Sequence, residues 1–165
     1  RWNTVKPSAL QVLEPIVALA MKSGYPIQAV GVQYQDAVRV QSPSPRDCTR
    51  RLLQQGSPWL TSRVWDDDRP WHIHQGWFSV GNESRLVHNL LNLDLLREPD
   101  SCLFRVNGQH RMLSVSSETD EALPLSGGDV SAALDRLHMD NKRALFDLLA
   151  DSVKEQIGLT VMETL

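Results

Sequence analysis

An alternation of apolar and polar residues between Ile27 and Val40 constrains the fold more than any other feature of this sequence. One parity holds Val30, Val32, Tyr34, Val38 and Val40, and the other holds Gln33, Gln35 and Arg39. Because successive side chains of a strand point to opposite faces, the pattern predicts a long strand with one buried face. Strands buried on a single face are typical of antiparallel sheets. Asp36 falls on the apolar parity, where it indicates either a bulge or the end of burial.

Further along the chain, five more stretches have strand-like patterns. They are Trp59–Trp65, Trp71–Val80, Arg85–Leu96, Cys102–Val106 and Gln109–Ser117. A polar turn of three aspartates and Arg69 separates the first two stretches. Asn107-Gly108 separates the last two and predicts a tight hairpin, because a type I′ turn needs positive φ at both central residues. We therefore expect an antiparallel, mostly meander sheet.

Helical periodicity appears in three places. The first is Ser8–Ser23, where Pro15 either kinks the helix or is its first residue. The second begins at Pro45 after Ser44 as N-cap and extends to Gln55. The third is a long amphipathic helix that begins after Asp129 or Ser131, breaks near Asp151 and ends at Gly158; its apolar side holds Leu134, Leu137, Leu145, Leu148 and Leu149.

Strands and helices are thus grouped rather than alternating, which predicts an α+β fold. We expect one face of the sheet to be covered by the N-terminal helix and the long C-terminal helix. The 165 residues, 41% of them hydrophobic and 22% charged, fit a single globular domain over 1–165. Since the chain opens without Met, we expect it to be a fragment of a longer chain that lacks its N-terminal segment.

Charge and cysteine content limit the partners and the compartment. The formal net charge is -3, which disfavours nucleic acid as a partner because phosphates attract a basic excess. The sequence has no apolar run of roughly 20 residues, so we expect a soluble protein and no membrane partner. Two cysteines, Cys48 and Cys102, are too few for a secreted disulfide scaffold. We expect reduced thiols and a cytoplasmic location, although the sequence leaves open whether the two are bonded.

The segment after the strand-like Trp59–Trp65 offers one candidate metal site. On a strand, His72 and His74 point the same way, and Asp66 or Asp68 from the preceding turn could add an oxygen ligand. A solvated acidic turn beside two polar strand residues explains the pattern better, because no third ligand has diagnostic spacing. We therefore expect no cofactor.

Four of the five tryptophans are spaced six residues apart in this same region: Trp59, Trp65, Trp71 and Trp77. Tryptophan is enriched at interface hot spots, so the four are candidate binding residues for a partner. The alternative is that most of them cover the core. Cys48 is a weaker candidate, as a nucleophile near a helix N-terminus, since no histidine is near it in sequence and a structural thiol is the simpler interpretation.

Three segments together suggest a family. They are Val30-Gly31-Val32-Gln33-Tyr34, His74-Gln75-Gly76-Trp77-Phe78, and the closing helix from Leu134 to Phe146. They resemble the C-terminal two-thirds of a family of uncharacterised prokaryotic proteins described as "sporadically distributed". That family usually has Gly-Leu-Arg-Tyr followed by Ile-Asn, where this chain has Gln33 for the arginine and Gln35-Asp36 for Ile-Asn. The resemblance implies a mobile or defence-type gene context, and it assigns no catalytic residues to this chain.

These observations favour a non-enzymatic interaction protein that self-associates or binds a protein partner through the region Trp59 to Phe78. The alternative is a metal-dependent hydrolase or nuclease that uses His72, His74 and an aspartate of the turn. A third possibility is a small-ligand pocket between the sheet and the helix Leu134–Leu149.

Overall fold

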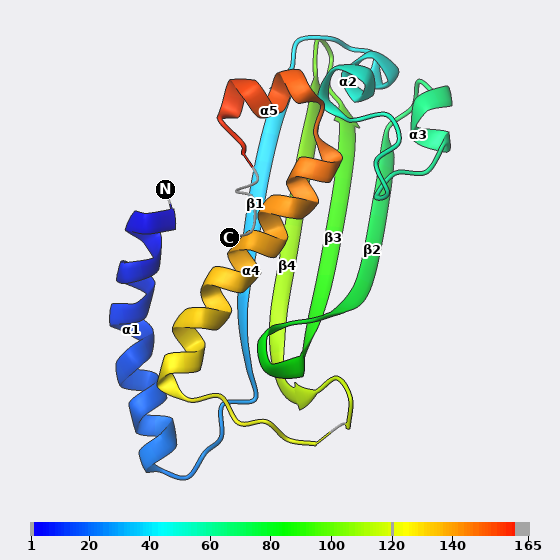
Figure 1. Ribbon diagram of the computed structural model, residues 1–165. Coiled ribbons are helices and arrows are strands. Elements are labelled where there is room, and N and C mark those ends of the chain that lie inside the picture. The colour runs from blue at the N-terminus through cyan, green and yellow to red at the C-terminus, as the bar shows by residue number, and fades with distance from the viewer. Residues whose placement is uncertain (1, 120, 161–165) are drawn as a thin grey trace. The chain divides into compact units, whose positions relative to one another are not determined.

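The computed structural model describes residues 2–119 and 121–160 (Figure 1). The elements in chain order are α1 (Trp2–Lys22), β1 (Ala29–Val40), α2 (Pro45–Leu52), α3 (Arg63–Asp66), β2 (Trp71–Val80), a 3₁₀ turn (Asn82–Ser84), β3 (Arg85–Arg97), β4 (Cys102–Ser116), α4 (Gly127–Leu148) and α5 (Asp151–Ile157). In this part of the chain, no helix combines the length and apolar character needed to cross a membrane. Positions 1, 120 and 161–165 of the expected domain lie outside the described residues.

The four strands form one antiparallel sheet in the order β1-β4-β3-β2, which confirms the predicted α+β class. Strands β2, β3 and β4 follow one another as a meander, and β1 adds to the far side of β4. This order makes β1 and β2 the two edge strands. The alternating burial of β3 and β4 gives the sheet one buried face and one half-exposed face. In β1, the apolar parity is only half-buried as far as Tyr34, and every residue from Gln35 to Arg39 is exposed, so Asp36 lies where burial has ended.

Packing divides the chain into two compact units, which are described separately. The first unit contains residues up to 32 together with 77–89 and 110–139. The second unit contains 33–76, 90–109 and the chain from 140 onwards. All four strands and α4 have residues in both units, so the boundary does not coincide with a linker.

The first unit has an apolar core between the sheet and the N-terminal part of α4. Val87 from β3 and Met112 from β4 pack with Ala133 and Leu137 of α4, and Leu125 joins them. Ile27, Val30 and Val32 are partly buried against this cluster. Leu137 is completely buried in this cluster.

The helix α1 belongs to the first unit and contacts α4. The Trp2 ring stacks on His138 at 4.4 Å between ring centroids, and its Nε1 donates to Asp135 at 2.9 Å. Lys6 forms an ion pair with the same Asp135 carboxylate at 2.5 Å. None of the described residues of α1 is fully buried, and Leu19 is 66% exposed. The N-terminal helix therefore lies against α4, and these contacts do not place it on the sheet.

The second unit buries β3 and β4 residues together with α2 and the C-terminal helices. Its fully buried side chains include Cys48, Leu52, Leu91, Leu93, Leu95, Cys102, Phe104 and Leu148. Ser44 caps α2 as predicted, because its Oγ accepts the Asp47 N–H at 3.2 Å. The predicted break near Asp151 is confirmed, and α5 ends at Gly158 with positive φ.

Two sequence-based predictions of local structure are wrong, and the predicted start of the N-terminal helix lies too far along the chain. Trp59–Trp65 is a series of turns followed by α3 instead of a strand. No turn forms at Asn107-Gly108, since β4 continues through both residues with unbroken alternation of burial. The helix α1 is longer than predicted and continues through both Pro7 and Pro15.

The uninterrupted β4 has a simple physical cause. A central strand has hydrogen-bonding neighbours on both sides, here β1 and β3, and these stabilise extended backbone against a local turn preference. Asn107 also accepts a hydrogen bond from Gln33 of β1 at 3.1 Å. The Asx-Gly signal is therefore overridden by tertiary contacts.

Candidate functional site

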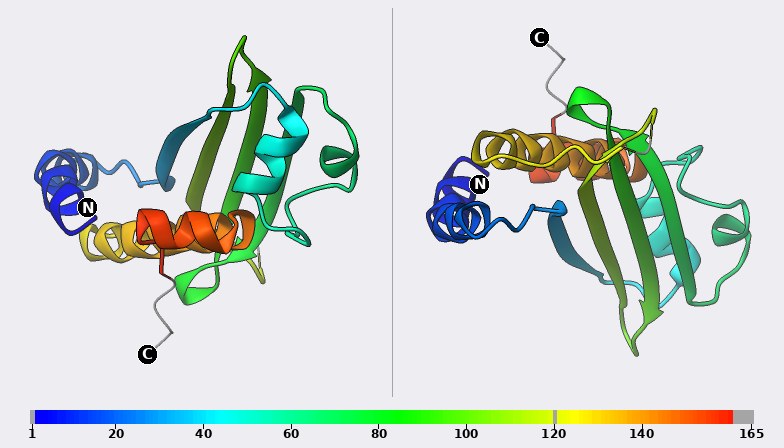
Figure 2. Two further views of the ribbon diagram at one scale, coloured as in Figure 1. Left: turned by 90° about the horizontal axis from the view of Figure 1, so that it is seen from above. Right: turned by 90° about the horizontal axis from the view of Figure 1, so that it is seen from below.

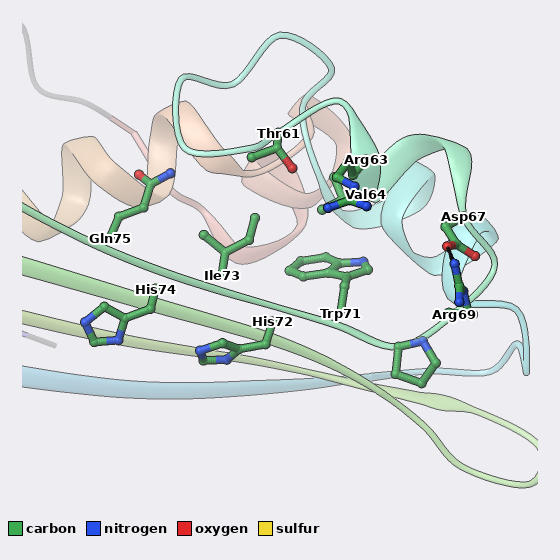
Figure 3. A pocket seen from close by; sticks show the side chains of 11 residues that line it. Thr61, Arg63, Val64, Asp67, Arg69, Trp71, His72, Ile73, His74 and Gln75 are labelled. Carbon is green, nitrogen blue, oxygen red and sulfur yellow. Dashed lines mark hydrogen bonds and ion pairs between the residues drawn. The ribbon is translucent and has the colours of Figure 1, made fainter.

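A groove of about 600 Å³ lies beside the edge strand β2 in the second unit (Figure 3). One side is formed by α3 and the residues just before and after it, including Thr61, Arg63 and Asp67. The other side is formed by five consecutive residues of β2, from Trp71 to Gln75. The groove lies inside the Trp59–Phe78 region to which the sequence drew attention.

Side chains of β2 alternate between two environments. Trp71, Ile73 and Gln75 are half-buried, whereas His72 and His74 are exposed. Figure 3 shows Ile73 and Gln75 pointing towards the segment of Thr61, while the two imidazoles point to the opposite side of the strand. Both parities line the groove, so it follows the free edge of the strand and not only one of its faces.

Trp71 forms the rigid part of the groove wall. Its Nε1 donates to Thr49 Oγ1 of α2 at 3.1 Å, and its ring lies 6.1 Å from Phe104 in a tilted arrangement. Phe104 is fully buried, which anchors the indole to the core while its outer part borders the groove. At the other end, Gln75 Nε2 donates to the Trp59 carbonyl at 3.0 Å and ties the preceding loop to the strand.

The charges around the groove leave one arginine without a counterion in the described part of the chain. Arg69 is paired with Asp67 at 2.5 Å, and this hydrogen bond holds the pKa of the Asp67 carboxyl below its usual range. Arg63 is exposed, and none of the interactions recorded among the described residues involves its side chain. The groove therefore offers a cation to a partner.

The aspartates proposed as metal ligands occupy different places. Asp68 accepts the Ser44 hydroxyl at 2.6 Å and the Arg46 N–H at 3.0 Å, so it supports the start of α2. Those two hydrogen bonds, with Arg97 nearby at 3.3 Å, lower the pKa of Asp68. The carbonyl oxygen of Asp66 accepts from the Arg46 guanidinium at 2.6 Å.

The two histidines lie side by side on the exposed face of β2, as the strand pattern predicts. Their ring centroids are 6.5 Å apart. His72 Nδ1 is 2.7 Å from Asp94 on β3, and Asp94 also lies 3.6 Å from the Arg105 guanidinium. Within residues 2–119 and 121–160, no three His, Cys, Asp or Glu side chains are placed to hold a metal ion. The structure thus pairs His72 with Asp94, whereas Asp68 contacts Ser44, Arg46 and Arg97.

The four candidate tryptophans are all half-buried and come from three different segments. Trp59 lies in a turn and Trp65 in α3, while Trp71 and Trp77 share one parity of β2. Trp77 belongs to the first unit and the other three to the second. Phe78, next to Trp77, is 61% exposed and stacks on His88 at 5.0 Å.

Sequence reasoning missed Arg63, Thr61 and Asp94. Arg63 and Thr61 were assigned to a strand, where their positions relative to β2 could not be inferred. Asp94 was visible as a polar residue alternating with leucines, but its pairing with His72 depends on the register of β2 against β3. No local signal in the sequence fixes that register.

Cys48 and Cys102 are both free and fully buried, which agrees with the prediction of reduced thiols. Burial, followed by the neighbouring Cys102, raises the pKa of Cys48 to about 12. A thiol with this pKa stays protonated at neutral pH and is a poor nucleophile. Cys48 is therefore a structural residue of the α2 contact.

Comparisons with known proteins add no family. The chain matches no protein-family model, and no curated protein is significantly similar to it.

Proposed function

We propose that this chain is a non-enzymatic interaction domain that binds a protein partner in the groove between α3 and the edge of β2. The observation that supports this most is the groove itself, which follows an edge strand and has a fixed aromatic wall at Trp71. Edge strands present unpaired backbone N–H and C=O groups, which favour pairing with another chain.

The side chains around the groove fit a docking role better than a catalytic one. Among the described residues, His72 has Asp94 and the His74 ring as recorded neighbours, and neither of these is a nucleophile. Catalysis by a histidine–carboxylate pair requires a third group that it activates, or a substrate held against it. The exposed position of His72 provides no such enclosure.

The cellular setting belongs to the same proposal. Two buried free thiols support a reducing compartment, and we propose the cytoplasm. The resemblance to the sporadically distributed prokaryotic family supports a mobile or defence-type gene context, in which small binding domains act on partner proteins. Self-association through the same groove is a second outcome of the test below.

Affinity capture from cells that express the chain, followed by reconstitution with the identified protein, tests the proposal. Thr61→Tyr fills the groove, and Thr4→Tyr makes the same change at an exposed position of α1. We expect wild type and Thr4→Tyr to bind the same partner with equal affinity and Thr61→Tyr to lose it at least tenfold. Equal binding by all three, or a catalytic activity that survives Thr61→Tyr, would overturn the proposal.

A further inference from the structure

Building on the proposed function, we infer that the partner supplies an extended peptide segment, which pairs with β2 over Trp71–Gln75 as a fifth strand and places an acidic side chain against Arg63. This names the binding mode and the chemistry of the ligand at the groove. Both follow from the backbone geometry, the size and the charge of that groove.

Five consecutive residues of β2, from Trp71 to Gln75, line the groove. A ligand lying on one face of a strand would meet every second residue, whereas this groove meets five in a row. Only the edge of a strand is in contact with both parities. In an antiparallel pair, every second residue directs its N–H and C=O away from its neighbour, so these groups of β2 face the groove. An extended peptide satisfies them with main-chain hydrogen bonds.

The size of the groove matches a short strand. Five residues at about 3.4 Å each give a binding edge of roughly 17 Å. At about 600 Å³, this open groove is within the volume range of ligand sites in proteins. We therefore expect four to five residues of the partner to be ordered in the groove.

The other edge of the sheet is protected, and this one is not. In β1 the exposed stretch from Gln35 to Arg39 contains Asp36, and its Arg39 is held in an ion pair with Glu98 at 2.8 Å. Charged side chains on an edge strand discourage pairing with other chains. The β2 segment Trp-His-Ile-His-Gln contains no Asp, Glu, Lys or Arg. Its composition permits strand addition.

Charge and polarity then define the peptide. Because Asp67 neutralises Arg69, Arg63 leaves the groove with one net positive charge, which an Asp or Glu of the peptide complements. Cross-strand neighbours pair by face. Apolar peptide residues should therefore lie beside Trp71 and Ile73, and polar ones beside His72 and His74.

Panning the full chain against a display library of random ten-residue peptides provides the probe. The selected peptides should carry Asp or Glu and avoid central proline, and fluorescence anisotropy of a labelled peptide gives the dissociation constant. Arg63→Glu should weaken binding about fivefold or more, the value of an exposed ion pair of about 1 kcal/mol. Arg50→Glu makes the same charge change on the exposed side of α2 and should stay within twofold.

Single N-methylation of each amide of the selected peptide reads the binding mode. Strand addition predicts tenfold or greater losses at every second amide of the four to five bound residues, with the intervening amides unaffected. Losses without this period of two, or peptides insensitive to Arg63→Glu, would overturn the inference. If a reconstituted protein partner is released by Thr61→Tyr while the peptides lack the two-residue period, this inference alone fails. If Thr61→Tyr releases nothing, the proposed function fails with it.

Discussion

Truncating Leu137 tests whether α4 holds the core of the first unit. The side chain is fully buried against a cluster that includes Val87 and Met112. Leu137→Ala removes three carbon groups worth about 0.8 kcal/mol each in transfer free energy, or about 2.4 kcal/mol. The cavity left behind adds to this, so we expect the free energy of unfolding to fall by about 2.5 to 5 kcal/mol.

Leu19→Ala is the matched control, because it makes the same change on a helix at a side chain that is 66% exposed. We expect its effect to stay within about 0.5 kcal/mol, as for other surface substitutions. Urea unfolding followed by circular dichroism measures both, and a lower midpoint with an unchanged slope identifies a true loss of stability. Equal effects of the two substitutions would refute the packing described for α1 and α4.

Three further predictions concern ionisation, thiols and metal. The native pKa of Asp68 is lowered by the Ser44 and Arg46 hydrogen bonds, so its contribution is present above the unfolded value near 3.8 and is lost as the pH falls through the native pKa. The free energy of unfolding should therefore fall less steeply with pH below pH 4 for Asp68→Asn than for wild type. Identical slopes would contradict the hydrogen bonds of Asp68 with Ser44 and Arg46. Ellman's reagent should find no fast thiol in the native chain and two after denaturation, because Cys48 and Cys102 are buried; rapid native reaction would show that α2 opens easily. Adding zinc should not shift the Tm of wild type or of His74→Ala, since the Asp68 carboxylate is already hydrogen-bonded to Ser44 at the start of α2. A rise in Tm with zinc that is confined to wild type would support the hydrolase alternative.

Much of the fold was predictable because its signals are local. The alternation in β2 and β3, the Ser44 cap and the helix end at Gly158 each depend on a few neighbouring residues. The hairpin predicted at Asn107-Gly108 failed because the pairing of β4 with β1 and β3 outweighs a two-residue preference. The strand predicted over Trp59–Trp65 is wrong because aromatic residues favour strands in general, whereas here the short helix α3 buries Val64.

The candidate site was only partly predictable for the opposite reason. The sequence identified the region from Trp59 to Phe78 and the shared face of His72 and His74. It could not show that Arg63 lies across a groove from β2, or that Asp94 rather than Asp68 meets His72, since both depend on contacts between segments distant in sequence. Contacts between distant segments bring these side chains together, whereas local periodicity predicts only the strands and helices that carry them.

Residue-resolved amide hydrogen exchange of β2 is the most direct test of the docking groove. The free chain should exchange quickly at every second amide from Trp71 to Gln75, because these N–H groups face the groove without a backbone partner. Saturation with a peptide selected by panning should protect those amides and leave the β1 edge at Gln35–Arg39 unchanged. If the peptide binds and the amides from Trp71 to Gln75 exchange as before, the groove at the β2 edge is not the docking site.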